Sequence, residues 1–232
     1  MRKVLGCIKR AQSEFNMIEE GDVVGVGLSG GKDSMVLLRA LSLFRRFAPV
    51  SYTLKAVTVD MGFDGFEIDK ISDFCRQEGV EHIAVPTDLG HLIFSERQED
   101  NPCGLCSRMR RGILNRVCQE NGITKLALGH HGDDLVETFL MSLLFESRLS
   151  AFKAVTEFER TETRQIRPLI YACEADVEAA CASEGIVPVI NPCPASGKTR
   201  REDMKRLVGE MEAVSGMPRD HIINAICRSD LV

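Results

Sequence analysis

The six residues Ser-Gly-Gly-Lys-Asp-Ser at positions 29–34, here called the hexad, join two segments of different periodicity. Residues 23–28 form a short, β-branched run punctuated by glycine, which predicts a buried parallel strand. Residues 36–44 carry apolar side chains at helical spacing, which predicts an amphipathic helix. A buried strand that passes through two glycines straight into a helix is typical of an α/β fold.

The hexad has the chemistry of a phosphate cradle. Gly30 and Gly31 let backbone amides approach an anion without a Cβ atom in the way. Ser29 and Ser34 add hydroxyl donors, and the N-terminus of the following helix adds partial positive charge. We therefore expect the hexad to bind the phosphates of a nucleotide.

Two simpler motifs fit the hexad less well. The phosphate-binding motif Gly-x-x-x-x-Gly-Lys-Ser/Thr does not match, because Gly25 and Gly31 stand one residue too far apart and Asp33 occupies the hydroxyl position. A Gly-Gly turn with a Ser or Asp helix cap accounts for any two of these residues, but not for six in this order after a strand.

The composition limits the class of protein. With 232 residues and 44% hydrophobic content, the chain can bury a core, and one domain with a modest appendage is expected. The net charge of -5 argues against a surface coated with basic residues for nonspecific nucleic-acid binding. The sequence has no apolar run of membrane-spanning length and no signal-peptide core near its start. We expect a cytoplasmic protein that does not enter membranes.

Strand and helix signals alternate along the chain. Further strands are expected at residues 52–59, 82–85, 125–128 and near 165–169. This alternation predicts a doubly wound, mostly parallel sheet, with a packing helix near residues 4–18 and a small helical C-terminal extension. Such sheets bind ligands at the carboxyl ends of their strands, where Ser29, Asp60 and His130 are expected to lie.

Nine cysteines without a secretion signal predict thiols, metal ligands or catalysts rather than disulfides. Cys103 and Cys106 form a Cys-x-x-Cys pair at the start of a predicted helix, where the helix and the nearby Arg108 and Arg110 are expected to lower thiol pKa values. Cys193, in a proline-flanked loop, is the expected third ligand. The remaining six are expected to be small buried hydrophobes: Cys7, Cys75, Cys118, Cys173, Cys181 and Cys227.

Three thiolates suit an iron–sulfur cluster with one open iron better than a closed zinc site, which has four protein ligands. A redox pair and a zinc site completed by histidine stay open as alternatives.

Four motifs stand together between about residues 22 and 197, in addition to the hexad. They are Cys103-Gly-Leu-Cys106-Ser-Arg-Met-Arg110-Arg111-Gly112, Gly129-His130-His131-Gly-Asp133-Asp134, Arg167-Pro168-Leu169 and Pro192-Cys193. The hexad resembles the loop of the PP-loop ATP pyrophosphatases, which have an adenine nucleotide alpha hydrolase-like fold and adenylate a substrate. The full set resembles the tRNA thiolation enzymes of the TtcA/TtuA group, most closely their 2-thiocytidine synthetase branch.

The resemblance implies three segments and a reaction. The segments are a packing helix at residues 1–20, a PP-loop ATPase domain at 21–190 with the inserted Cys-x-x-Cys helix, and a third-cysteine loop with a helical segment at 191–232. In the family, ATP adenylates a tRNA base, and three cysteines hold a 4Fe-4S cluster whose free iron binds sulfide. The implied partners are tRNA and a sulfur donor (sulfide, a cysteine desulfurase or a sulfur carrier protein), and a homodimer is allowed.

The family roles can be carried over residue by residue. The expected ATP ligands are Ser29, Gly30, Gly31, Lys32, Asp33, Ser34, Asp60, Gly129 and His130, with Mg²⁺ near Asp33. The expected metal ligands are Cys103, Cys106 and Cys193, and the expected catalytic residues are Arg110, Asp133 and Asp134. The expected RNA contacts are Arg108, Arg111, Arg116, Arg167, Lys198, Arg200 and Arg201.

The sequence departs from this family in two places. Ser196 stands where the branch has a further cysteine, and the zinc-finger cysteines of the 2-thiouridine branch are absent. Further functions therefore stay open. They are nitrogen transfer with structural zinc, thiolation of uridine or of a free nucleobase, and a nucleotide-binding or iron–sulfur sensor without turnover.

Overall fold

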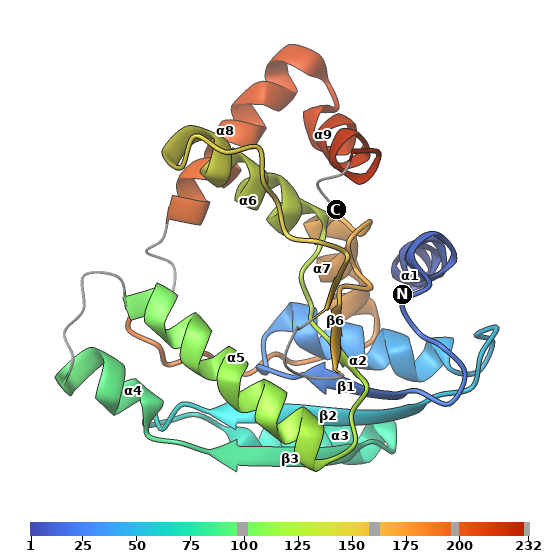
Figure 1. Cartoon of the computed structure of the whole chain (residues 1–232), viewed down its shortest axis with the longest axis vertical. Helices are drawn as coiled ribbons and strands as arrows, with labels where there is room; N and C mark the ends of the chain where they lie inside the picture. Colours follow the sequence, from blue (N-terminus) through green and yellow to red (C-terminus); the bar gives the residue numbers. More distant parts are fainter. Residues whose placement is uncertain (97–101, 158–162, 196–199, 230–232) are drawn as a thin grey trace.

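The computed structural model describes residues 1–96, 102–157, 163–195 and 200–229. Its centre is a sheet in the order β3-β2-β1-β4-β6-β5, in which every neighbouring pair is parallel except β5 and β6 (Figure 1). The strands are β1 (Val23–Gly27), β2 (Thr53–Asp60), β3 (Glu81–Pro86), β4 (Lys125–Ala127), β5 (Val155–Glu157) and β6 (Arg164–Ile166). The predicted doubly wound, mostly parallel sheet is confirmed.

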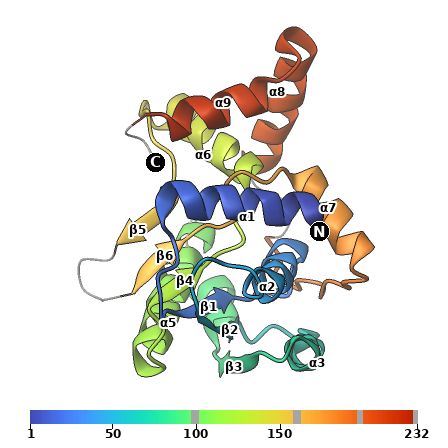
Figure 2. The ribbon, with the colours of Figure 1, turned by 90° about the vertical axis from the view of Figure 1, so that its right-hand side faces the viewer.

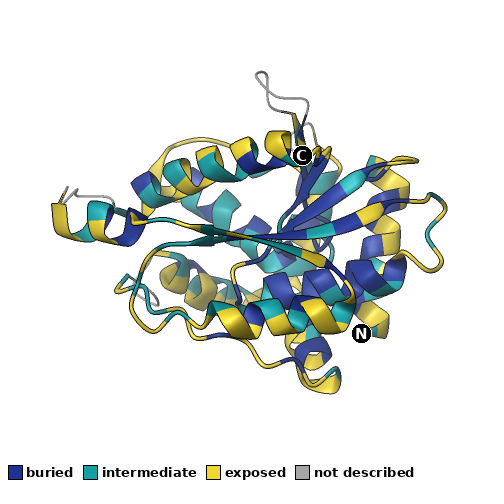
Figure 3. Ribbon diagram, turned by 90° about the horizontal axis from the view of Figure 1, so that it is seen from below, coloured by how far each residue is buried: buried dark blue, intermediate teal, exposed yellow. Residues whose placement is uncertain are grey.

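Helices cover both faces of the sheet. The helices before β4 are α1 (Arg2–Phe15), α2 (Lys32–Phe44), α3 (Ile68–Glu78), α4 (Leu89–His91), the π-helix η1 (Leu92–Glu96) and α5 (Pro102–Glu120). The later helices are α6 (Gly132–Phe145), α7 (Glu174–Ser183), α8 (Arg200–Ser215) and α9 (Pro218–Cys227). Figure 3 shows α5 on one face of the sheet, with further helices on the other.

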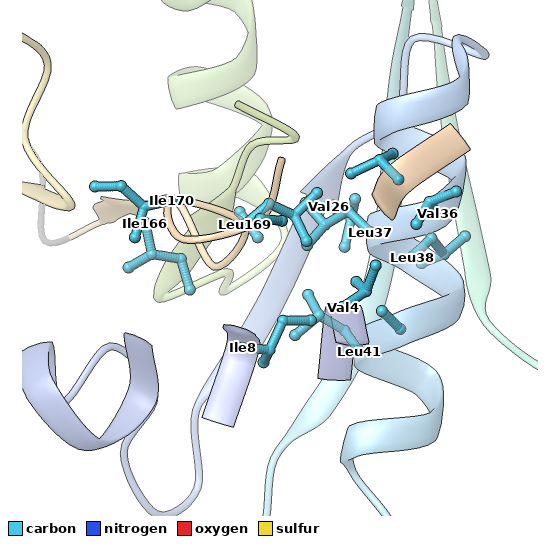
Figure 4. Close-up of a cluster of buried hydrophobic side chains, with 14 of the residues drawn as sticks. Val4, Ile8, Val26, Val36, Leu37, Leu38, Leu41, Ile166, Leu169 and Ile170 are labelled. Atoms are coloured by element: carbon cyan, nitrogen blue, oxygen red, sulfur yellow. The ribbon is translucent and has the colours of Figure 1, made fainter. Parts of the chain in front are cut away.

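The alternation of side chains along β1 explains these two layers. Val24 and Val26 are fully buried and belong to the large core that α1, α2 and α7 complete (Figure 4). Val23 points the other way, into a smaller core formed with α5. Gly25 faces that smaller core too, where an added Cβ would lie 2.8 Å from Ile123 Cδ1. The glycines in β1 therefore allow close packing on the α5 face.

The last two helices form a small layer on α6. Both α8 and α9 pack against α6 and against each other, on the side away from β2 and β3 (Figures 1 and 2). Met204 of α8 and Ile223 and Ile226 of α9 are buried there. The expected helical C-terminal extension is thus present, and it lies beside the helix that follows β4.

Two local features differ from the sequence predictions. α1 ends at Phe15 rather than continuing to residue 18, because Asn16 adopts a left-handed conformation with φ 44°. β5 and α7 are additional to the predicted elements. The apolar run at residues 186–190 is neither strand nor helix, and it is anchored where Val189 N donates to Gly30 O at 2.9 Å. No helix among the described residues has the length and apolarity needed to cross a bilayer.

Candidate functional site

A cleft with a volume of about 510 Å³ opens at the carboxyl ends of the parallel strands. The ends of β1, β2, β4 and β6 contribute Ser29, Asp60, His130 and Arg167 to its lining. Arg110 enters from α5 on the other side. Further predicted residues that line the same cleft are Gly31, Asp33, Ser34, Arg111, Gly129, Asp134 and Arg201.

The hexad forms a closed loop through its own hydrogen bonds. Ser34 Oγ accepts from Ser29 N at 3.2 Å and donates to Gly31 O at 2.9 Å. Ser29 Oγ lies 3.2 Å from Ser34 Oγ and accepts from Gly31 N at 3.4 Å. Gly31 is the N-cap of α2, and no side chain caps that helix end. The backbone N–H groups at this helix N-terminus therefore face the cleft without a side-chain cap, as a phosphate site requires.

Gly129 brings the end of β4 against the hexad. A Cβ atom on Gly129 would lie 3.0 Å from both Asp33 C and Ser34 N, which are backbone atoms. Gly30 has φ +82°, and a Cβ there would lie 2.9 Å from Ile71 Cδ1. These two positions need glycine for close packing, and together they join the hexad to β4 and to residues 186–190.

Lys32 is directed away from the cleft lining. Its Nζ lies 3.1 Å from Glu174 Oε1 and 3.3 Å from Asp33 Oδ1. Glu174, at the start of α7, also binds Lys205 Nζ of α8 at 2.6 Å. Burial acts to raise the pKa of Glu174, but the hydrogen bonds and charges of Lys205 and Lys32 lower that pKa to about 2. Sequence reasoning missed Glu174, because nothing near it in the chain marks it as a partner of the hexad.

Asp33 lies half-buried in the first turn of α2. Burial raises the pKa of its carboxyl, although the charges of Lys32 and His131 act to lower that pKa. His131 is itself buried, with Nε2 3.8 Å from Asp33 Oδ1 and Nδ1 3.6 Å from Asp134 Oδ2. A carboxylate that is costly to bury beside a phosphate cradle is a suitable ligand for a divalent cation.

Asp133 and Asp134 have different surroundings in the structure. Asp134 lines the cleft, and its Oδ2 accepts from His131 N at 3.0 Å in a capping box at the start of α6. Asp133 does not line the cleft. Its Oδ2 accepts from Glu174 N at 2.7 Å and its Oδ1 from Arg219 Nη1 at 2.9 Å. Asp133 thus caps α7 and anchors α9.

Arg201 enters the cleft from α8. Its Nη1 donates to Asp134 Oδ1 at 3.2 Å and to Glu137 Oε2 at 3.1 Å, and its Nη2 donates to Thr138 Oγ1 at 3.3 Å. Burial raises the pKa of Glu137, and Asp134 raises it further against the effect of Arg201. No sequence motif indicates that α6 supplies these partners.

His130, Phe152 and Arg167 pack together beside β4 and β6. The rings of His130 and Phe152 lie 5.3 Å apart, and the Arg167 guanidinium lies 4.9 Å from the Phe152 ring. Arg167 is 7% exposed, and Nη1 donates to Lys153 O and to Thr156 Oγ1. Burial lowers the pKa of His130 to about 4, so this imidazole is neutral at pH 7.

The three expected cluster cysteines lie close to the cleft. Cys103 and Cys106 are in the first two turns of α5, and residues next to Cys106 and Cys193 line the cleft. Burial raises the pKa of the Cys106 thiol against the lowering effect of Arg110, and the nearby thiols of Cys193 and Cys103 raise that pKa further. The predicted lowering is therefore wrong for Cys106, because burial outweighs the arginine.

The donor set fits a cluster in its chemistry. The thiols of Cys103 and Cys193 and the guanidinium of Arg110 lie near enough to Cys106 to affect its pKa, and iron–sulfur clusters are held by thiolates. The fit does not extend to their spacing, because among the described residues no group of three or more His, Cys, Asp or Glu side chains is spaced to hold a metal ion. Of the other six cysteines, Cys75, Cys118 and Cys181 are buried and the rest are half-buried.

The remaining predicted RNA contacts lie outside the cleft lining. Arg108 and Arg116 are exposed on α5, where Arg116 Nε lies 3.9 Å from Glu120 Oε1. Arg200 lies 4.5 Å from the Phe145 ring centroid. Lys198 and Ser196 fall outside the described residues. The structure therefore brings Arg110, Arg111, Arg167 and Arg201 together at one cleft but not the whole predicted set.

The sequence matches the ATP_bind_3 family, a PP-loop domain, over residues 7–210. This match covers most of the chain, so the protein is a member of the PP-loop class. Its relatives include tRNA-cytidine(32) 2-sulfurtransferases from Geobacter sulfurreducens, 38% identical over 229 residues, and from Geobacter metallireducens, 37% identical over 228 residues. Each alignment covers 97% of this chain and 89% of the relative. The chain belongs to this sulfurtransferase family, and the resemblance drawn from its motifs is confirmed.

Solved structures share the fold. U34-tRNA thiolase NcsA from Methanococcus maripaludis, determined with its 4Fe-4S cluster, aligns with a TM-score of 0.77 and 24% identity over 96% of this chain and 78% of that one. The NH3-dependent NAD synthetase from Campylobacter jejuni aligns with a TM-score of 0.55 and 12% identity over 99% of this chain and 93% of that one. The second alignment shows that the same fold also occurs in a protein named for a different reaction.

Proposed function

We propose that this protein is an ATP-dependent tRNA sulfurtransferase that adenylates the C2 carbonyl oxygen of a cytidine and replaces that oxygen with sulfur. The observation that carries the proposal is a single cleft that combines the hexad, Arg110, Asp134 and the neighbourhood of three thiols. The names of its relatives, which cover nearly the whole chain, support tRNA cytidine as the substrate.

The first chemical step needs a bound nucleotide and a polarised carbonyl. The hexad binds the phosphates, and Asp33 is suited to hold a Mg²⁺ ion that ATP brings. The carbonyl oxygen attacks the α-phosphorus, its bond to phosphorus forms, and pyrophosphate leaves. Arg110, always protonated, polarises the carbonyl but cannot move a proton. Asp134 is the carboxylate placed to accept one, and we assign it that role in preference to Asp133.

The second step replaces the oxygen. A pyrimidine carbonyl oxygen is a poor leaving group, whereas an adenylated oxygen leaves as AMP when a sulfur nucleophile forms a bond to C2. A 4Fe-4S cluster held by Cys103, Cys106 and Cys193 would supply that sulfur. The cysteine side chains would fix it beside the cleft, and the exposed Arg108, Arg111 and Arg116 would bind RNA phosphates.

The proposal includes partners and a location. tRNA is the substrate, sulfide or a sulfur-donating protein is the co-substrate, and both are met in the cytoplasm. A homodimer is compatible with this function, which needs no second chain.

Pyrophosphate release by anaerobically reconstituted protein tests the proposal. We expect release that depends on tRNA, a brown chromophore, and iron content that falls by half or more in Cys193→Ala but not in Cys118→Ala. Incorporation of ammonia in place of sulfide into the product, by a colourless zinc protein, would support nitrogen transfer instead. Pyrophosphate release with no RNA requirement would contradict the substrate assignment.

A further inference from the structure

Arg201 links the C-terminal helices to the cleft. Its three hydrogen bonds reach Asp134, Glu137 and Thr138, which lie on one face of α6 at spacings of three and four residues. The Glu137 side chain is only 12% exposed. This planar guanidinium is therefore fixed along the first turns of the helix that follows β4.

The Asp134 carboxylate is bonded at both oxygens as a result. Its Oδ2 accepts from the backbone N of His131 at 3.0 Å, and its Oδ1 accepts from Arg201 at 3.2 Å. A carboxylate bonded in this way cannot rotate without breaking one of the two hydrogen bonds. The helix cap supplies one constraint locally, and Arg201 supplies the second from 67 residues away in the sequence.

We propose that Arg201 is a positioning residue that fixes the orientation of the Asp134 carboxylate in the cleft, an inference that rests on the proposed function. Without the guanidinium, Asp134 and Glu137 face each other as like charges, and Asp134 loses the partner of Oδ1. The C-terminal helices thereby support the reaction through the Asp134 carboxylate. This role differs from the RNA contact that the sequence predicted for Arg201.

The two roles give different kinetics. A residue that touches ATP or RNA phosphate contributes to binding, so its removal raises KM or Kd for that ligand. A residue that only orients Asp134 affects turnover, and its removal lowers kcat while both affinities stay the same.

The experiment compares Arg201→Ala, Arg201→Lys and Arg76→Ala with the parent in tRNA-dependent pyrophosphate release. Arg76 is the matched control, because its exposed pair with Asp73 at 2.6 Å lies on α3, away from the cleft. We expect R201A to lower kcat by roughly 10- to 100-fold with unchanged KM for ATP and unchanged Kd for tRNA. Added guanidinium ion should restore part of the R201A rate, and R201K should be intermediate, because a point charge lacks the planar fork.

Three results would overturn the inference. R201A could keep the parent's kcat, it could lose affinity for ATP or tRNA at constant kcat, or guanidinium could fail to rescue a folded variant. If R201A does not fold, R201K decides, and full activity of R201K counts against the inference. A parent without tRNA-dependent release overturns the proposed function as well, whereas an active parent with an active R201A overturns this inference alone.

Discussion

Asp133 and Asp134 are adjacent in the sequence but serve different parts of the molecule. Asp133 bonds the start of α7 and Arg219, whereas Asp134 lines the cleft. We predict that Asp133→Asn lowers the free energy of unfolding by about 1–2 kcal/mol, because one of two buried acceptors is lost. Asp134→Asn should instead abolish tRNA-dependent turnover.

Urea unfolding and initial rates of pyrophosphate release, measured on both D133N and D134N, check these two roles. Because each variant keeps the shape of its side chain, the two measurements should separate the two residues. A D133N variant that is inactive while as stable as the parent would reverse the assignment.

His130 should make the protein sensitive to acid. Burial holds the pKa of its imidazole at about 4 in the folded protein, against about 6.5 in an unfolded chain. As the pH falls from about 6.5 to about 4, the unfolded chain binds a proton that the folded protein does not, so stability is lost over that range. We expect a loss of about 2 kcal/mol between pH 7 and pH 5 from this residue.

Urea unfolding at both pH values tests the prediction. The loss should be about 2 kcal/mol smaller in His130→Asn than in the parent. The matched control is His221→Asn at an exposed position of α9, which should keep the parent's pH dependence. Identical pH dependence in the parent and in H130N would contradict a neutral imidazole with a lowered pKa at this half-buried position.

At the scale of elements, the contact between the end of β4 and the hexad depends on Gly129. An added Cβ would press on the backbone at Asp33 and Ser34, so the two segments must separate. We predict that Gly129→Ala weakens ATP binding by about tenfold, because the phosphate site loses its alignment. Gly6→Ala on α1, where nothing lies within 4 Å of the new atom, should leave ATP binding unchanged. Calorimetric titration with ATP measures both, and equal affinities would argue against this contact.

The sheet could be predicted because its central strands are buried on both sides and end at glycine or polar residues. β5 could not, because this edge strand has no buried residue and a single apolar side chain, so it leaves no apolar run in the sequence. α7 could not, because its buried side chains include the small Ala180 and Cys181, which give little periodic signal. The domain limits at residues 20 and 190 stay predictions.

The cleft lining could be predicted only as far as local motifs reach. The hexad and the Gly-His segment mark two strand ends, and parallel pairing places them at one edge. Glu174, Arg219 and Glu137 could not be predicted, because their partners come from distant segments and ion pairing follows the tertiary packing of α6, α7, α8 and α9.

At the scale of the whole molecule, the basic residues of α5 and those of α8 do not form one uniform patch. Arg201 and Lys205 are bound to carboxylates of α6 and α7, whereas Arg108, Arg111 and Arg116 are exposed along α5. We predict that replacing these three α5 arginines by Gln weakens tRNA binding and flattens its salt dependence by up to about three units. ATP binding should not change.

The control is a second triple variant that also removes three positive charges. Arg45, Arg46 and Arg76 are exposed away from the cleft, so their replacement by Gln should leave the salt dependence as in the parent. Equal slopes of affinity against salt for both triple variants, measured by filter binding, would show that α5 does not face the RNA.

The proposed reaction has one product, a tRNA cytidine that carries sulfur at C2. Mass spectrometry of nucleosides from the tRNA of a strain that lacks this gene tests it most directly. We expect 2-thiocytidine to be absent from that strain, restored by the parent gene, and not restored by the D134N or C193A variants. An unchanged amount of 2-thiocytidine in the deletion strain, or the loss of a different thiolated nucleoside, would contradict the proposed function.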